Sequence, residues 1–243
     1  MKKNTIVAGA LLCLLASVAA AEEAVDMASE PHHHQVLDND LVRVFAVTIG
    51  PHETTQLTRH EHSYLVISLE DCEIASWAKG QAGVITYRYN QNDTRFFFGG
   101  PARTLRNDTP NPYHNLTVEF LNPRVTTFGY QPEAGRWEYG SSAIPPPVDS
   151  RAKFSDAMEL GEATVKDVQL LPDDSYPAPE KETSELLIAL SDLDLKTKES
   201  RIRKAQGDLV WIDPGRKSEL LNNATGPARF VLIELRQQAS PAN

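Results

Sequence analysis

Two distant stretches of this chain share one order of residues, and this internal repeat constrains the fold more than any other feature. Residues 50–71 and 171–192 each contain a proline turn, a polar arm, and an apolar run that closes on an aspartate. The matched pairs are Pro51 and Pro172, Leu65 and Leu186, Ile67 and Ile188, Leu69 and Leu190, and Asp71 and Asp192. A second set of matches closes each copy: Asn107, Pro112 and Glu119 correspond to Asn222, Pro227 and Glu234. Ordered matches at both ends of a segment predict a duplicated domain.

Short strand patterns fill both copies of the repeat. Runs of β-branched and aromatic residues, separated by Gly, Pro, Asn and Asp, are typical of strands and their turns. The predicted strands are 41–49, 54–59, 64–69, 84–89, 95–98, 116–120 and 124–130 in the first copy, and 164–171, 186–190 and 208–212 in the second. The unbroken apolar run 64–69 is expected to be buried on both faces. The sequence therefore predicts an all-β protein of two barrels or sandwiches.

The ends and the middle of the chain predict how it is divided. Residues 1–21 carry Lys2 and Lys3, an apolar stretch, and alanines that end at Ala21, which is the pattern of a cleavable secretory signal peptide. We therefore expect the protein to be secreted or periplasmic. The expected segments are then a flexible N-terminal segment 22–35, a first domain 36–130, a Pro-rich linker 131–155, a second domain 156–236 and a C-terminal tail 237–243.

Acidic residues outnumber basic ones along the chain. There are 33 Asp and Glu against 24 Lys and Arg, and loss of Lys2 and Lys3 leaves 22 basic residues and a net charge of −11. Such a surface disfavours nucleic acid, and also a membrane once the signal peptide is removed, whereas a small-molecule ligand or a homo-oligomer is compatible with it. Cys72 is the one cysteine after cleavage, so we expect a half-buried thiol and no internal disulfide.

The order of these elements resembles the cupin superfamily, and specifically its two-domain members, the bicupins. The resemblance rests on the strand, proline turn, polar arm and apolar strand, on the hairpin and Gly turn at Gly99-Gly100, and on the Asn-x4-Pro-x6-Glu ending of each copy. It implies two tandem antiparallel jelly-roll barrels, each with a pocket at one mouth, joined by the Pro-rich linker. Cupins include oxygenases, isomerases, sugar binders and storage proteins, so the fold does not fix the function.

Metal-binding cupins carry a His-x-His pair, a glutamate and a third histidine. Counted from the proline turn, the resemblance places these ligand positions on Thr58, His60, Tyr64 and Arg103 in the first copy, and on Pro179, Lys181, Glu185 and Ser218 in the second. Only His60 and Glu185 are usual metal ligands, and Arg103 and Lys181 bring fixed positive charges that repel a metal ion. The resemblance therefore implies two degenerate metal sites and no cofactor, with an ion pair between Lys181 and Glu185 in place of the second metal.

The first copy offers a different kind of site from the same residues. Thr58, His60, Tyr64 and Arg103 are expected to line one pocket at the mouth of the barrel. A guanidinium donates two parallel hydrogen bonds, which suits a carboxylate. The favoured hypothesis is therefore non-enzymatic binding of a small, anionic molecule by the first barrel.

Two other hypotheses stay open at the level of sequence. In the first, His60 and His62 share a strand face and, with His52 or His114, hold a divalent Fe, Mn, Zn, Cu or Ni ion in an oxygenase or isomerase. In the second, the protein has a structural or assembly role through an exposed apolar face. The triplet 32–34 lies close to the predicted N-terminus of the mature chain and is expected to bind metal only loosely.

Overall fold

The computed structural model describes residues 23–122, 125, 153–179 and 182–236. The predicted signal peptide 1–21, the tail 237–243, Lys181 and most of the predicted linker lie outside the described residues. Within these ranges, no helix has the length and hydropathy needed to cross a membrane.

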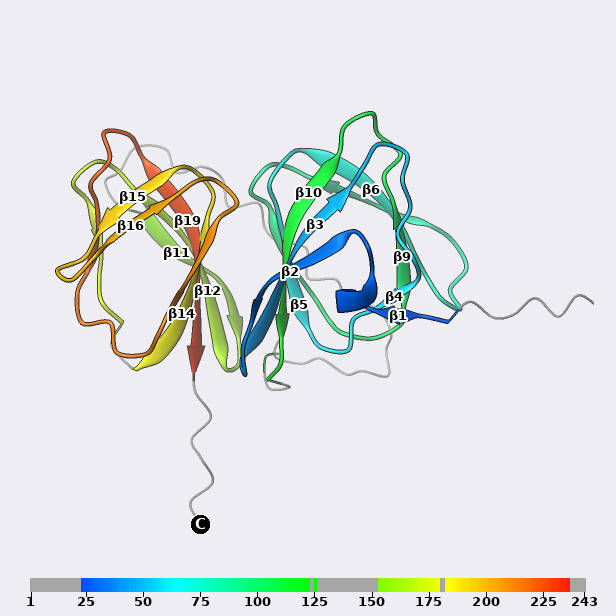
Figure 1. The fold of residues 1–243 in the computed structure, drawn as a ribbon, viewed down its shortest axis with the longest axis horizontal. Coiled ribbons are helices and arrows are strands. Elements are labelled where there is room, and N and C mark those ends of the chain that lie inside the picture. The colour runs from blue at the N-terminus through cyan, green and yellow to red at the C-terminus, as the bar shows by residue number, and fades with distance from the viewer. Residues whose placement is uncertain (1–22, 123–124, 126–152, 180–181, 237–243) are drawn as a thin grey trace, which may run out of the picture.

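The first barrel is built from two five-stranded sheets (Figure 1). One sheet has the order β1-β4-β9-β6-β7, with bounds Val25–Asp26, Thr58–Arg59, Arg103–Arg106, Cys72–Ala78 and Ile85–Tyr89. The other has the order β2-β3-β10-β5-β8, with bounds His33–Asp38, Val42–Ile49, Tyr113–Phe120, Tyr64–Ser68 and Thr94–Phe97. A short 3₁₀ turn, η1 (Met27–Ser29), connects β1 to β2.

The second barrel repeats this arrangement with one strand fewer. Its five-stranded sheet has the order β11-β12-β19-β14-β17, with bounds Lys153–Leu160, Ala163–Leu170, Ala228–Arg236, Thr183–Ala189 and Leu209–Ile212. Its four-stranded sheet has the order β13-β18-β15-β16, with bounds Ser175–Tyr176, Leu220–Asn222, Leu193–Lys196 and Arg201–Lys204. The strand order matches the first barrel strand for strand, apart from the extra β1. The predicted all-β fold of two tandem barrels is confirmed.

Matching turns show the duplication at the level of single residues. The residue after each turn proline, His52 or Asp173, takes a positive φ, 61° in one copy and 65° in the other. The amide of Asn107 is buried and donates to the backbone oxygens of Ile49, Gly50 and Asn111. The amide of Asn222 donates in the same way to the backbone oxygens of Leu170 and Gly226. Both asparagines therefore close the same turn in their own barrel.

The sheet that contains β5 in the first barrel packs against the sheet that contains β14 in the second barrel. In β5, Leu65 and Ile67 belong to an apolar cluster shared with Leu186 and Ile188 of β14, whereas Tyr64 and Val66 face the interior of the first barrel. This explains the unbroken apolar run 64–69, which is buried on both faces as expected. Full burial of each such aliphatic side chain contributes about 1.5–3 kcal/mol, so the interface stabilises both barrels.

The expectation of a flexible segment at 22–35 is wrong. Residues 25–29 form β1 and η1, β1 pairs in parallel with β4, and β2 begins at His33 and pairs with β3. Met27 is fully buried in the core of the first barrel, and Glu30 is 1% exposed. The sequence does not reveal that these residues are buried, because the segment is polar and its apolar residues do not recur with the period of a strand or a helix. The second domain also begins earlier than expected, since β11 starts at Lys153 inside the predicted linker.

Candidate functional site

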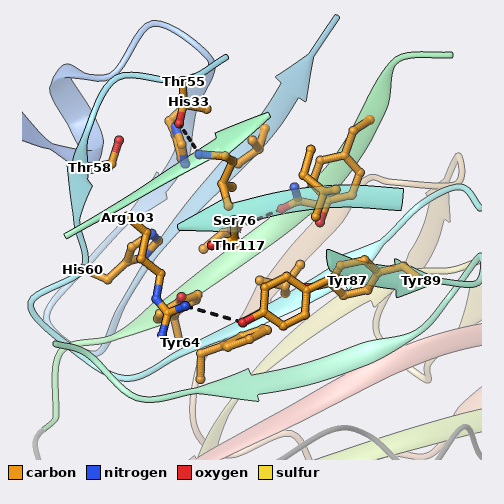
Figure 2. Close-up of a pocket in the computed structure, with 17 residues that line it drawn as sticks. His33, Thr55, Thr58, His60, Tyr64, Ser76, Tyr87, Tyr89, Arg103 and Thr117 are labelled. Atoms are coloured by element: carbon orange, nitrogen blue, oxygen red, sulfur yellow. Dashed lines mark hydrogen bonds between the residues drawn. The ribbon is translucent and has the colours of Figure 1, made fainter. Parts of the chain in front are cut away.

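A pocket opens inside the first barrel (Figure 2). The space within it that can hold the centre of a water molecule is about 40 Å³. That is room for about three waters or for a ligand with few non-hydrogen atoms. All four residues predicted to bind a ligand, Thr58, His60, Tyr64 and Arg103, line it. Counting from the proline turn therefore identified side chains that the fold brings to one cavity.

Arg103 comes from β9 and lies directly opposite Thr58 of β4 in the sheet. Its guanidinium extends along the pocket and donates a long hydrogen bond, 3.4 Å, to the Tyr87 hydroxyl. The aromatic wall beside it is a stack in which the Tyr64 ring lies 4.0 Å from His60 and 5.2 Å from Phe97, measured between ring centroids. A permanent cation thus faces a cavity with rigid aromatic walls.

His60 contributes a neutral imidazole. Burial, followed by electrostatic interactions with His33 and Arg103, lowers its pKa from 6.5 to about 3. Its Nδ1 atom is buried and has no hydrogen-bond partner among the described residues, and the same holds for Ser76 Oγ, also on the pocket wall. Unpartnered buried polar atoms are rare in folded proteins, so these two favour a bound polar molecule.

The pocket also contains a residue that the sequence analysis discounted. His33, the middle member of the histidine triplet, lines the pocket, and its Nδ1 lies 2.6 Å from Glu30 Oε2. Burial by itself raises the pKa of Glu30, but hydrogen bonds from His33, His32 and the Gln56 backbone outweigh burial and lower it to about 2. The one signal in the sequence for this pair is a glutamate three residues before a histidine. The same spacing also occurs in flexible chain ends, so it does not predict a buried pair.

A wider hollow lies at the mouth of the barrel and shares His60 with the pocket. Among the described residues that line this hollow, Arg59 and Lys79 are basic and Glu61 is acidic. Of the described residues that line the inner pocket, none is Asp or Glu. The approach to the pocket and its wall are therefore positively charged, although the chain as a whole is acidic.

The four histidines suggested for a metal do not come together. Residues 60–63 belong to no strand, because the chain leaves β4 at Arg59 and joins β5 at Tyr64, so the alternation that paired His60 with His62 does not apply. His52 is exposed in its turn. His114 bonds Glu70, with its Nδ1 3.1 Å from Oε1, and lies between two residues that point into the barrel. Neither these two nor His62 lines the pocket.

The residues present do not fit the metal site of the superfamily. In the described part of the chain, no three His, Cys, Asp or Glu side chains gather as a metal-binding group. Arg103 holds the position expected of a third histidine, and its charge disfavours a metal ion there. The pocket therefore has the donors and the charge of an anion site.

The second barrel has a buried ion pair at the equivalent position. Glu185 is fully buried and accepts two hydrogen bonds from the Arg216 guanidinium, at 2.7 Å and 2.8 Å. Arg216 also donates to the backbone oxygens of Ser218 and Pro177. Glu185 does form an ion pair, with Arg216 reaching the carboxylate from the Gly turn at Gly215. The expected partner, Lys181, lies outside the described residues, so the pair with Lys181 stays a prediction.

Three solved structures are similar to the chain over most of its length. A glyoxylate-induced protein from Pseudomonas aeruginosa matches with a TM-score of 0.63 and 13% identity, over 85% of this chain and 80% of its own. A cupin 2 conserved barrel domain protein from Leptotrichia buccalis matches with 0.57 and 7%, over 84% and 88%. Salicylate 1,2-dioxygenase from Pseudoaminobacter salicylatoxidans, with gentisate, matches with 0.55 and 13%, over 80% and 68%.

These similarities concern the fold, because the identities are low. No protein-family model matches the sequence, and no curated protein matches it. The similar structures confirm the cupin fold that the family resemblance implies. The chemistry of the site has to be argued from its own residues.

Proposed function

The chain folds as a pair of cupin barrels, and from the pocket of the first barrel we propose that it binds a small anionic ligand, with a carboxylate as the best match. The single observation that carries the proposal is the Arg103 guanidinium, which lines a cavity whose described wall has no acidic side chain. An arginine fork donates two parallel hydrogen bonds to a carboxylate and adds a favourable charge.

Other groups of the pocket support the same class of ligand. Ser76 Oγ has no partner among the described residues, and its hydroxyl can donate to a carboxylate oxygen. Arg59 and Lys79 at the mouth raise the local concentration of anions. The predicted signal peptide supports the proposal that this binding takes place in the periplasm or outside the cell.

Calorimetric titration with acetate, pyruvate and neutral acetamide tests the proposal. We expect both carboxylates to bind and acetamide to bind weakly, since it lacks the charge that Arg103 recognises. The substitution Arg103→Gln removes a charge-assisted hydrogen bond worth about 1.5–3 kcal/mol, so affinity should fall about tenfold to hundredfold. Arg103→Lys keeps the charge but loses the two parallel hydrogen bonds. Its affinity should therefore lie between those of the wild-type protein and Arg103→Gln.

The matched control is Arg106→Gln on the same strand. Arg106 is exposed, pairs with Asp108, and does not line the pocket. It should bind carboxylates like the wild-type protein. Equal affinity of Arg103→Gln and wild type, or equal affinity for acetamide and acetate, would contradict the proposal.

A further inference from the structure

A buried carboxylate–imidazole pair lies beside the ligand pocket and has no part in the binding described above. His33 Nδ1 is 2.6 Å from Glu30 Oε2, and the two side chains are 3% and 0% exposed. An ionised carboxylate only accepts hydrogen bonds, so the proton between them sits on Nδ1 of the imidazole. The other ring nitrogen, Nε2, then carries a lone pair in the neutral ring and can accept a proton.

The His33 ring faces the inside of the barrel. His33 pairs with Val47 in the β2–β3 ladder, and both residues line the pocket. Its centroid lies 6.5 Å from that of His60, which in turn stacks on Tyr64. Glu30 does not line the pocket. The Nδ1 edge of the ring is therefore turned to the carboxylate, and the rest of the ring contributes to the pocket wall.

A hydroxyl that can hold a ligand oxygen lies on the opposite sheet. Ser76 of β6 pairs with Leu105 of β9, which is the next inward-facing position along that strand after Arg103. Its side chain is buried, with 1% exposed, and its Oγ has no partner among the described residues. A molecule anchored by Arg103 thus meets one unused hydroxyl donor and one imidazole base in the same cavity.

We propose that His33 is a general base that removes a proton from the carbon beside the carbonyl group of a small 2-oxo acid anchored by Arg103. The C–H bond breaks, an Nε2–H bond forms, and the C–H electron pair moves into an enolate whose oxygen accepts a hydrogen bond from Ser76. Return of the proton to carbon completes the enolisation without an oxidant, a reductant or a second substrate. Glu30 is a positioning residue that fixes the tautomer and orientation of the ring. The inference rests on the proposed anion binding at Arg103.

Hydrogen–deuterium exchange of pyruvate tests this step directly. The intact protein is incubated with pyruvate in D₂O, and loss of the methyl proton signal is followed by NMR. We expect exchange faster than in buffer, and a drop of about hundredfold or more in the protein-catalysed rate for His33→Gln, since general bases contribute at least that much. Pyruvate affinity should be unchanged in this variant. His34→Gln, on the exposed neighbouring residue, is the matched control and should exchange at the wild-type rate.

Glu30→Gln separates positioning from simple structural support. Its amide group can donate to Nδ1 and thereby place the ring proton on Nε2, where no base is left. Exchange at saturating pyruvate should then fall while the half-saturating concentration stays the same. In ¹⁵N-histidine NMR spectra, the His33 ring should change from the Nδ1–H to the Nε2–H tautomer.

The outcomes distinguish this inference from the proposed function. Pyruvate binding without exchange, or exchange by His33→Gln at the wild-type rate, overturns the inference and leaves anion binding intact. Absence of pyruvate binding overturns the proposed function, and the inference with it. If His33→Gln does not fold, ¹⁵N-histidine spectra of the wild-type protein decide: the Nδ1–H tautomer with a pyruvate-dependent shift at Nε2 is expected, and an unchanged Nε2 signal contradicts the inference.

Discussion

The two barrels share one scaffold but use an arginine in opposite ways. In the second barrel, the Arg216 guanidinium is buried, with 5% exposed, and is neutralised by Glu185 at 2.7 Å. In the first barrel, the Arg103 guanidinium lines a cavity and donates a 3.4 Å hydrogen bond to the Tyr87 phenol. The difference teaches that the barrels of a duplicated fold can diverge in two directions: one holds a buried ion pair, and the other has an arginine that lines a pocket.

The largest expected effect comes from breaking the ion pair of the second barrel. Glu185→Gln leaves the Arg216 charge buried without its counter-charge, which should lower the free energy of unfolding by about 3–5 kcal/mol. Urea unfolding measures this change. In the first barrel, Arg103→Gln should change the same quantity by less than about 1 kcal/mol, since Arg103 is only partly buried.

A double variant checks that charge burial is the cause. Glu185→Leu combined with Arg216→Leu removes both charges and should restore much of the stability lost in Glu185→Gln, because apolar replacements of buried ion pairs are often neutral. If Glu185→Gln and Arg103→Gln lowered the free energy of unfolding equally, the two arginines would not differ in the way proposed here.

The residues that sequence analysis placed correctly lie at fixed distances from local signals. The proline turns and the asparagine turns are local, and they recur in order, so the duplicated fold and the backbone positions of Thr58, His60, Tyr64 and Arg103 follow from counting. The largely apolar sequence of β5 predicted burial on both faces of the strand, since a half-exposed antiparallel strand alternates.

The site residues that could not be predicted from the sequence depend on contacts between distant segments. His33 enters the pocket because β2 pairs with β3, and no periodicity within residues 22–35 signals that pairing. Arg216 reaches Glu185 because a long side chain folds back from a turn, whereas counting along a repeat finds only equivalent backbone positions. His62 was misplaced because the strand period was applied to residues that belong to no strand.

Acid should destabilise the first barrel through His60. Because burial and nearby cations hold its pKa at about 3 instead of 6.5, the unfolded chain binds a proton below pH 6.5 that the folded protein does not. Stability is therefore complete above pH 6.5 and falls by about 1.4 kcal/mol for each unit as the pH drops towards 3. Glu30, whose pKa is lowered from 4.5 to about 2, adds a further loss below pH 4.5.

The window from pH 6.5 to 4.5 isolates the histidine from the glutamate. His60→Phe keeps a ring stacked on Tyr64 and removes the titrating group, so its free energy of unfolding should vary less with pH in this window than that of the wild-type protein. His52→Gln, at an exposed turn residue, is the control and should keep the wild-type slope. An identical slope in wild type and His60→Phe would mean that His60 is not held neutral by its site.

The smallest expected difference concerns the shared scaffold. Asn107 and Asn222 are both fully buried and close equivalent turns through their side-chain amides. Either change to alanine leaves buried backbone oxygens without donors, which should cost about 1–3 kcal/mol in each barrel. The exposed Asn90→Ala is the control and should stay within about 0.5 kcal/mol of wild type. Similar losses of unfolding free energy at the two positions would show that the two turns still stabilise their barrels equally, although the sites have diverged. A loss in only one barrel would show that the turns have diverged as well.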